Sequence, residues 1–357
     1  MTKKNFSASL LQWDQIKNDR KMPWKGEKDP YKIWISEIIL QQTRVQQGLI
    51  YYERFIDAFP DIKSLAIAPE KKIYKLWEGL GYYSRCKNLI ATAKFIHENL
   101  NGKFPEKYEN ILSLKGIGHY TASAIASFAF DQPYAVLDGN VFRVLSRFFG
   151  KEIPINTSAG KKFYTVLAQA LLDKNNPAKY NQAIMDFGAV VCKPALPLCF
   201  KCPLKKECVA FLKNKVDVLP VNKKVVKQKE RFFNYLIVQN DEKVYVSKRT
   251  EKDIWQNLYE FILIESHDWL HENEVIEDER FLSLFQKHDF SIKFVSKKIS
   301  QKLTHQLITG QFIHVEINRP LSVQSHFAAN RNQLKTLPFP KFIASYLTDK
   351  NVSLNLI

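Results

Sequence analysis

The spacing of hydrophobic residues in this chain changes near residue 213, and two kinds of domain follow from that change. Before it, apolar residues recur three and four positions apart, as at Ile35, Ile38 and Ile39, which is the spacing of an amphipathic helix. After it the spacing falls toward two. Segments such as FFNYLIVQN and QFIHVEIN are predicted strands, with one helix predicted over ENEVIEDERFLSLFQKH. The 357 residues are enough for two hydrophobic cores. The predicted fold is a mostly α-helical N-terminal region followed by an α+β C-terminal domain.

A basic segment separates the two regions. Residues 213–231 carry seven Lys or Arg against two acidic residues and show little periodicity. We interpret 213–230 as a linker, although VNKKVVK within it also fits a charged surface strand. The predicted organisation is therefore a helical region over 1–212, the linker, and a second domain over 231–357.

The composition indicates a polyanionic partner. Lys and Arg number 53 against 36 Asp and Glu, so the net charge is +17, and nucleic acid is the commonest polyanion for so basic a protein. A lysine-rich surface that serves only solubility is the alternative. No apolar run approaches the roughly 20 residues of a membrane span, and MTKKNFSASL lacks the apolar core of a signal peptide. These features predict a cytosolic protein.

Four of the five cysteines lie close together in the pattern C-x6-C-x2-C-x5-C. In a cytosolic chain such a group indicates a metal site and argues against a disulfide framework. The spacing leaves two metals open: zinc, which more often uses two short cysteine pairs, and a four-iron cluster, which suits a compact loop with a single C-x2-C. The metal would be structural. The four predicted ligands are Cys192, Cys199, Cys202 and Cys208.

Two Gly-x-Gly turns are candidates for contact with a nucleic acid. The stretch LSLKGIGHYTASAI places Gly116 and Gly118 between two predicted helices, as in a helix-hairpin-helix that holds a phosphate through backbone N–H groups. An ordinary helix–helix turn fits the same residues. The second turn, in EGLGYYSR, is followed by Tyr82 and by further aromatic and basic residues. Such tyrosines either stack on or wedge between bases, or pack against a helix.

Two carboxylates lie in surroundings suited to acid–base chemistry. Glu37 interrupts the apolar helical segment IWISEIILQQ, where burial would raise its pKa as a general acid requires; an exposed position is the alternative. Asp138 lies in VLDGNVFRV and is expected to cap the helix starting near Val141, which leaves a catalytic role open. Glycosidic cleavage uses one carboxyl group to protonate the leaving group and another to stabilise the oxocarbenium ion. The same logic applies to a base leaving deoxyribose.

Together these motifs resemble the helix-hairpin-helix DNA glycosylases with an iron–sulfur loop, and among them the adenine DNA glycosylases that act on adenine opposite 8-oxoguanine. The C-terminal domain resembles the family's Nudix-like domain more loosely, through WQNLYEF and the LTH at 303–305. The resemblance implies a base-excision repair enzyme with a 4Fe–4S cluster on the four cysteines, structural in role and with redox sensing as a second potential role. It covers nearly all of residues 10–212 through the blocks MPWKGEKDPYKIWISEIILQQTRV, WEGLGYYSR, LKGIGHYTASAIASFAF, VLDGNVFRVLSR and NQAIMDFGAVVC, together with the cysteine spacing.

The resemblance also implies roles for single residues. In the related endonuclease III family a lysine at the position of Tyr120 attacks the sugar. Because tyrosine cannot form a Schiff base, base removal without efficient strand cleavage is expected. Glu37 would protonate adenine at N7 and later help to activate water, and Asp138 would stabilise the oxocarbenium ion, with Tyr120 and Asn140 around the sugar. The other implied contacts are Trp24, Lys25 and Gln182 with the extrahelical adenine, Gln42 and Tyr82 as wedges in the duplex, Leu40, Thr43 and Leu80 near the orphaned 8-oxoguanine, and Gly116 and Gly118 on a phosphate.

The C-terminal domain departs from the family's pattern at the loop that reads the lesion. The usual Phe-Ser-His is Leu303-Thr304-His305 here. Thr304, beside His305, keeps a hydroxyl that can hydrogen-bond the lesion, whereas Leu303 lacks the aromatic ring, so discrimination between 8-oxoguanine and guanine is expected to be weaker or differently arranged. The domain also lacks a Nudix hydrolase box, so binding without nucleotide hydrolysis is expected.

The preferred hypothesis is a monofunctional adenine DNA glycosylase. It would act as a monomer on double-stranded DNA with A:8-oxoguanine or A:G mispairs, in the cytoplasm of a bacterium and associated with the nucleoid, with the linker as a docking segment for unidentified repair or replication proteins. One alternative is an endonuclease III-like glycosylase and lyase for oxidised pyrimidines, against which Tyr120 and the extra domain count. The other is a non-catalytic iron–sulfur DNA-binding protein in which Glu37 and Asp138 only pack and cap.

Overall fold

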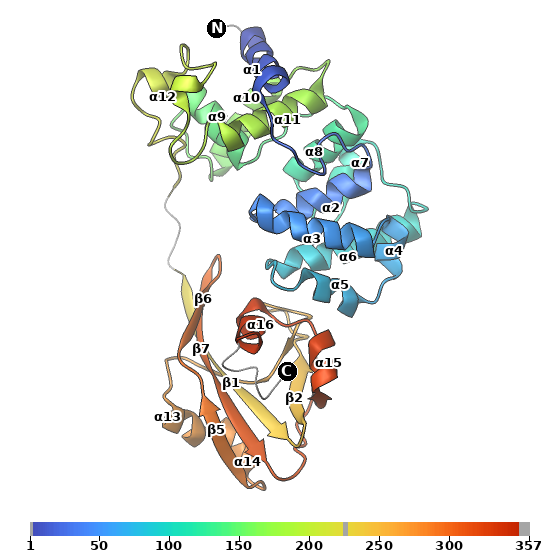
Figure 1. Ribbon diagram of the computed structural model, residues 1–357, viewed down its shortest axis with the longest axis vertical. Helices are drawn as coiled ribbons and strands as arrows, with labels where there is room; N and C mark the ends of the chain where they lie inside the picture. Colours follow the sequence, from blue (N-terminus) through green and yellow to red (C-terminus); the bar gives the residue numbers. More distant parts are fainter. Residues whose placement is uncertain (1–2, 224–227, 350–357) are drawn as a thin grey trace. The chain divides into compact units, whose positions relative to one another are not determined.

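The computed structural model describes residues 3–223 and 228–349 and divides into two compact units (Figure 1). The first unit comprises Met1–Ile67 and Lys87–Val225, and the second comprises Ala68–Cys86 and Val226–Ile357. The first is helical and the second is built around a sheet, as the change in hydrophobic spacing predicts. No helix among the described residues is long and apolar enough to span a membrane.

The first unit packs its helices around a core of aromatic and aliphatic side chains. Phe6 and Trp13 of the first helix lie in that core with Phe187, a residue far along the chain. α6 (Tyr83–Asn99) begins in the second unit and continues into the first. The other helices are α1 (Lys3–Lys17), α2 (Pro30–Leu40), α3 (Val45–Ala58), α4 (Ile62–Ile67), α7 (Tyr108–Ser113), α8 (His119–Phe130), α9 (Gly139–Phe149), α10 (Ser158–Leu171), α11 (Pro177–Val190) and α12 (Val209–Leu212), with a short 3-10 helix at Cys199–Lys201.

The pair Asp29-Pro30 predicts a helix start, and the helical spacing of YKIWISEIILQQTRV predicts that the helix continues through Val45. Helix α2 begins at the predicted place and ends earlier. The Asp29 side chain accepts a hydrogen bond from the Tyr31 N–H at 2.9 Å, and Pro30 occupies the first helical position. It stops at Leu40 because Gln42 adopts a left-handed conformation with a φ of 56°. The four residues that follow α2 therefore form a loop.

The described residues of the second unit form a mixed eight-stranded sheet. Strands β1 and β7 pair in parallel, with Lys229 opposite Gln306, and the other pairs are antiparallel. The main strand order is β3-β2-β1-β7-β5, with β4 on β1, β6 on β7 and β8 on β2. The strands are β1 (Lys229–Asn240), β2 (Lys243–Lys248), β3 (Tyr259–Glu260), β4 (Ile262–Ser266), β5 (Phe290–Val295), β6 (Ile299–Lys302), β7 (Gln306–Ile317) and β8 (His326–Asn330).

Short helices accompany this sheet. The single helix predicted over ENEVIEDERFLSLFQKH is two helices, because the chain leaves helical geometry at Asp278, whose side chain caps the second one by accepting from the Arg280 N–H at 2.9 Å. The sequence patterns predict neither strand β8 nor the last two helices, because each of these elements is short. The helices are α5 (Glu70–Trp77), α13 (Glu272–Glu277), α14 (Glu279–Phe285), α15 (Arg331–Thr336) and α16 (Lys341–Leu347).

The compact units differ from the predicted ranges at two places. Residues 68–86 lie within the predicted helical region 1–212 but belong to the second unit. The start of the predicted linker is tied to the first unit: the Ile155 N–H donates to the Val221 carbonyl at 3.0 Å, and Asn156 exchanges two hydrogen bonds of 2.8 Å with the Lys223 backbone. Residues 224–227 of the linker lie outside the described residues.

Candidate active site

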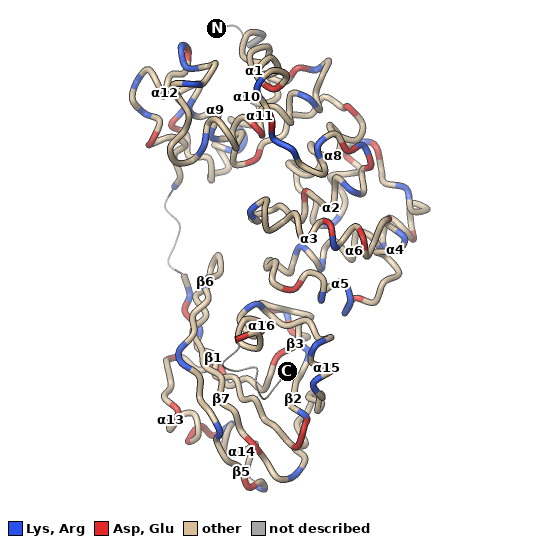
Figure 2. The backbone as a smooth tube through the Cα atoms, viewed as in Figure 1, with Lys and Arg blue, Asp and Glu red and all other residues tan. Residues whose placement is uncertain are grey.

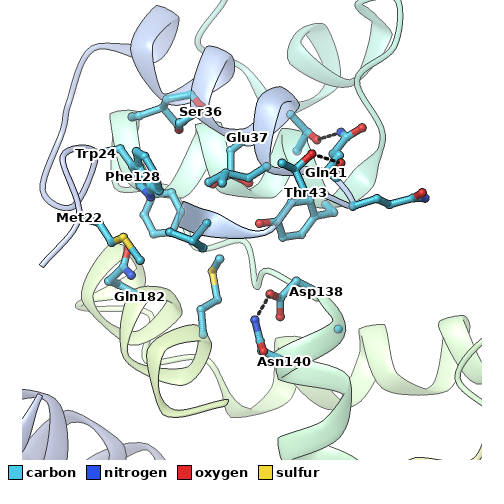
Figure 3. A pocket seen from close by; sticks show the side chains of 18 of the residues that line it. Met22, Trp24, Ser36, Glu37, Gln41, Thr43, Phe128, Asp138, Asn140 and Gln182 are labelled. Atoms are coloured by element: carbon cyan, nitrogen blue, oxygen red, sulfur yellow. Dashed lines mark hydrogen bonds between the residues drawn. The ribbon is translucent and has the colours of Figure 1, made fainter. Parts of the chain in front are cut away.

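A cavity of about 510 Å³ lies within the first unit, between α2, α8, α11 and the loop before α9 (Figure 3). Glu37 faces it from α2, while Asp138 and Asn140 approach from the opposite side. The structure brings ten of the predicted site residues together here: Trp24, Glu37, Leu40, Gln42, Thr43, Gly118, Tyr120, Asp138, Asn140 and Gln182. The lining also includes residues that the sequence analysis did not select, namely Arg20, Met22, Ile33, Ser36, Gln41, Val45, Thr121, Phe128, Gly139 and Met185.

Glu37 is buried, with 6% of its surface exposed. Removal from water raises the pKa of its carboxyl group to about 7, and the nearby negative charge of Asp138 adds to the rise. A hydrogen bond from the Tyr120 hydroxyl acts in the opposite direction. At neutral pH the Glu37 carboxyl group is therefore divided between its protonated and ionised forms, as a general acid requires.

Asp138 both caps α9 and faces the cavity. One carboxylate oxygen accepts from the Val141 N–H at 2.7 Å, and the other accepts from the Asn140 side-chain amide at 2.7 Å. Burial raises the pKa of Asp138 from its ordinary value, and these hydrogen bonds oppose the rise because they favour the ionised form. The cap predicted from the sequence is confirmed.

A second layer of contacts holds Asn140 in place. The Arg143 guanidinium donates to the Asn140 side-chain carbonyl at 2.8 Å and to the Gly188 carbonyl at 2.8 Å. A methyl group at position 188 would lie 2.6 Å from the Asn140 Cβ, so only glycine permits this approach of α11 to α9. Asn140 is thus held by contacts between α9 and α11, which are distant in sequence.

Tyr120 lies in the first turn of α8 and hydrogen-bonds to Glu37 through its hydroxyl. Burial and the two adjacent carboxylates hold the pKa of Tyr120 well above its usual range. The side chain therefore remains a neutral phenol, which donates a proton in a hydrogen bond and offers no amine for attack on a sugar.

One wall of the cavity is organised by Asp186, which is fully buried on α11. Its carboxylate accepts from Arg20 at 2.6 Å, from Lys25 at 3.1 Å and from Gln182 at 3.0 Å. Lys25 is therefore tied to Asp186 and is absent from the residues that line the cavity. Trp24 beside it packs edge-on against Tyr52, with ring centroids 5.3 Å apart.

The two glycines of the hairpin before α8 serve different purposes. Gly116 has a φ of +79°, and a methyl group there would lie 2.6 Å from the Asn88 Cβ, so the close turn requires glycine. Gly118 has no atom within 4 Å of the position that a Cβ would occupy, and it lines the cavity. The hairpin thus leaves open space before the backbone N–H groups that begin α8, where an anion can approach.

The four clustered cysteines enclose a separate cavity of about 30 Å³. Arg147 lies against it: its guanidinium is 3.6 Å from the Cys192 sulfur and donates to the Lys193 carbonyl at 2.7 Å. Within residues 3–223 and 228–349, no three Cys, His, Asp or Glu side chains are grouped as a site for a single metal ion. Cys86, the fifth cysteine, is buried and belongs to the second unit.

The remaining predicted site residues belong to the second unit. Thr304 and His305 are exposed at the turn between β6 and β7, and Leu303 beside them is half-buried. Tyr82 is 46% exposed, whereas Leu80 is buried. None of these residues is among those that line the cavity of the first unit.

The family of the chain follows from its relatives. Residues 35–159 match the model of the HhH-GPD superfamily of base excision DNA repair proteins, and residues 234–349 match the NUDIX domain. The adenine DNA glycosylase of Buchnera aphidicola subsp. Baizongia pistaciae is 35% identical over 350 residues, which cover 95% of each chain. The chain belongs to the adenine DNA glycosylase family. This membership favours a catalytic adenine glycosylase over both alternatives that the sequence left open.

Solved structures support the same fold for the helical region. A thermostable thymine-DNA glycosylase is 30% identical, with a TM-score of 0.55 over 59% of this chain and 97% of that structure. Endonuclease III in a non-covalent DNA complex is 20% identical, with a TM-score of 0.51 over 60% of this chain and 98% of that structure. The second likeness shows the helix-hairpin-helix glycosylase fold alone.

Proposed function

We propose that this adenine DNA glycosylase removes adenine opposite 8-oxoguanine or guanine from double-stranded DNA. Glu37 carries the proposal: a buried carboxyl group whose pKa is raised to about 7 faces Asp138 across one cavity. A cavity of about 510 Å³ is large enough to enclose a nucleobase and its sugar. Base flipping brings such a nucleotide out of the duplex and into an enclosed site.

The proposed reaction uses the two carboxyl groups in different protonation states. Protonated Glu37 transfers its proton to N7 of adenine, and the bond between C1′ and N9 breaks as its electron pair moves to the base. Ionised Asp138 stabilises the positive oxocarbenium ion that remains on the sugar. Water then attacks C1′ and gives a proton to Glu37, so that the products are adenine and an abasic site.

Tyr120 makes the proposed enzyme monofunctional. Strand cleavage by a lyase requires a Schiff base between C1′ and an amine. Tyr120 instead supplies a hydroxyl group, and no lysine is among the residues that line the cavity. The expected product is therefore an abasic site in an uncut strand, with Asn140 beside the sugar.

The rest of the DNA contact is assigned to residues around and beyond the cavity. Trp24, Lys25 and Gln182 would surround the extrahelical adenine, and Gln42 and Tyr82 would occupy the gap left in the duplex. Leu40, Thr43 and Leu80 would lie near the orphaned base, with Thr304 and His305 reading its identity. Gly116 and Gly118 would bind a phosphate. Lys and Arg are spread over both units (Figure 2), so affinity should fall steeply with salt.

The four clustered cysteines would hold a 4Fe–4S cluster. The fit is supported by a cavity that all four thiols line and by the chemistry of cysteine thiolates, which are the usual ligands of such a cluster. When bound, such a cluster supplies structural cross-linking of the loop and electron-transfer capacity. Arg147 would stabilise the negative charge of the thiolates through its contact with Cys192.

The proposed function comes with a domain organisation and a cellular location for the protein. The helical catalytic region spans 1–212, the linker 213–230 and the Nudix-like lesion-recognition domain 231–357. The protein acts as a monomer in the bacterial cytoplasm, associated with the nucleoid. The linker remains the proposed docking segment for repair or replication proteins.

The first experiment uses the purified protein and a duplex with one adenine opposite 8-oxoguanine, analysed with and without alkali. Strand breaks that appear only after alkali are the expected result, because an abasic site breaks in alkali. Cleavage without alkali would contradict the role of Tyr120. A matched duplex with guanine opposite the adenine measures the preference for the lesion.

A further inference from the structure

We propose that the Leu337–Phe339 segment of the second unit is a clamp that positions the turn at residues 78–83, and with it Tyr82. This proposal rests on the proposed function, in which Tyr82 enters the duplex. Its observations are independent of the chemistry in the cavity, because they concern the second unit alone. The clamp would join the domain that reads the opposite base to the residue that helps to open the duplex.

The turn presents Tyr82 in a conformation that needs support. Gly79, Gly81 and Tyr82 all have positive φ angles, of 89°, 76° and 48°. Glycine adopts such angles freely, but tyrosine does so only when surrounding contacts hold it. Tyr82 is nevertheless 46% exposed, so its own side chain supplies little of that support.

Part of the support comes from within the turn. The Gly81 carbonyl accepts hydrogen bonds from the Trp77 indole at 3.0 Å and from the Arg85 guanidinium at 3.2 Å. The same guanidinium lies 5.3 Å from the centre of the Tyr82 ring and 5.4 Å from that of Trp77. Arg85 therefore supports one side of the exposed ring through a cation–π contact.

The rest comes from the backbone of Phe339, which is contacted from two sides. Its N–H donates to the Glu78 carboxylate at 2.8 Å, and its carbonyl accepts from the Tyr83 hydroxyl at 3.3 Å. The Tyr83 hydroxyl also accepts from the Gly79 N–H at 3.3 Å. Lys75 adds a third contact, with its ammonium group 3.0 Å from the Leu337 carbonyl. Residues at both ends of the turn are thus fixed to the backbone of Phe339 and of nearby Leu337.

The sequence Leu337-Pro338-Phe339-Pro340 restricts the backbone on both sides of Phe339. Both flanking prolines have fixed φ angles and lack an N–H, so the Phe339 N–H is the sole backbone donor of the three residues from 338 to 340. The Phe339 side chain is buried and stacks on Phe261 at 5.7 Å, and the Pro338 carbonyl accepts from the Tyr259 N–H at 2.9 Å. The core of the second unit therefore determines where the turn is held.

Two substitutions remove the clamp without touching Tyr82. Tyr83→Phe deletes one hydroxyl and with it the hydrogen bonds to the Gly79 N–H and the Phe339 carbonyl, and Glu78→Ala deletes the acceptor for the Phe339 N–H. Glu78 also accepts from the Lys75 ammonium group, and Glu78→Gln keeps one acceptor oxygen that can serve the Phe339 N–H, so the clamp should be retained in that variant. Tyr74→Phe is the matched control, since it deletes a hydroxyl that accepts from Asn257 at 3.0 Å within the same unit but leaves both Phe339 hydrogen bonds in place.

Hydrogen exchange of the peptide over residues 78–85 tests the clamp in the full chain without DNA. Exchange should become about tenfold faster in Tyr83→Phe and Glu78→Ala, as expected for the loss of one or two hydrogen bonds, and stay unchanged in both controls. Unchanged exchange in the two clamp variants would overturn the proposal. This measurement gives its result even if the natural protein fails to release adenine, which would instead refute the proposed function.

Base extrusion tests what the clamp does. The fluorescence of 2-aminopurine next to the target adenine is followed after mixing with protein that also carries Glu37→Gln, so that chemistry does not interfere. The signal should rise about tenfold more slowly in the clamp variants and normally in the controls. Faster hydrogen exchange with unchanged extrusion would show that the turn is held without positioning Tyr82, and would overturn the proposal.

Discussion

The cavity of the first unit and the β6–β7 turn of the second are built in opposite ways. In the cavity, Glu37 is buried and its partners Tyr120 and Asp138 are fixed by contacts from several helices. At the turn, Thr304 and His305 are exposed. Chemistry on the base needs exclusion of water and a shifted pKa, whereas identification of the opposite base needs polar groups that are free to meet DNA. Substitutions in the two regions should therefore differ in size and in their dependence on the opposite base.

The largest effect is expected from Glu37→Gln. Removal of the general acid should slow adenine release by about 10²–10⁴-fold, and by the same factor opposite 8-oxoguanine and opposite guanine. Single-turnover release on both duplexes measures it, with DNA affinity measured in parallel. Ser36→Ala is the control, because Ser36 lines the same cavity but its hydroxyl donates to the Ile33 carbonyl. A slower release of adenine opposite only one of the two bases would contradict the contrast between the cavity and the β6–β7 turn.

The same substitution should stabilise the first unit. The pKa of Glu37 is raised from 4.5 to about 7 in the fold, so the unfolded chain loses this proton first as the pH rises. The free energy of unfolding then falls between these two values, by about 3 kcal/mol in total. Glutamine has no proton to lose, so the free energy of unfolding of Glu37→Gln should not fall over this pH range. The variant should therefore be more stable than the natural protein above pH 7, and this difference should vanish below pH 4.5. Hydrogen exchange of α2 at acidic and mildly alkaline pH measures the difference.

The sequence reveals the carboxylate in this helix but not what surrounds it. Asp29 and Pro30 predicted the start of α2 correctly, whereas its end at Leu40 has no Gly or Pro to mark it. Asp186 also interrupts an apolar helix, as Glu37 does, but its sequence context does not predict that it organises a wall of the cavity. Its partners Arg20 and Lys25 lie 166 and 161 positions away along the chain. Local patterns predict elements, but long-range contacts decide which buried charge is paired.

In the second unit, too, local sequence patterns predict the elements but not the long-range contacts between them. Alternating residues predicted its long strands, because a half-buried strand shows a period of two. Nothing local predicts that residues 68–86 join it, since that association depends on contacts with residues far along the chain. Asn257, which donates to Tyr74, and the Phe339 amide, which donates to Glu78, lie 183 and 261 positions away.

The pH dependence of adenine release should report the burial of Glu37. Only the protonated form transfers a proton to the base, so the rate constant should fall about tenfold for each pH unit above about 7. The pKa of Tyr120 lies well above this range and does not interfere. A single-turnover profile on the 8-oxoguanine duplex measures it. An inflection near 4.5 would mean that Glu37 is hydrated and that the cavity is less closed than the comparison requires.

The smallest effect is expected at the exposed turn. Thr304→Ala removes the hydroxyl proposed to hydrogen-bond the opposite base, and the preference for 8-oxoguanine over guanine should fall by roughly 1–3 kcal/mol, the size of one good base contact. Release opposite guanine should change little, because the cavity is intact. The ratio of single-turnover rate constants on the two duplexes measures the preference, and Thr304→Ser, which keeps the hydroxyl, is the matched control. An unchanged ratio in Thr304→Ala would assign recognition of the lesion to other residues. Equal slowing on both duplexes would show that the turn affects the chemistry, and the contrast between the two regions would no longer hold.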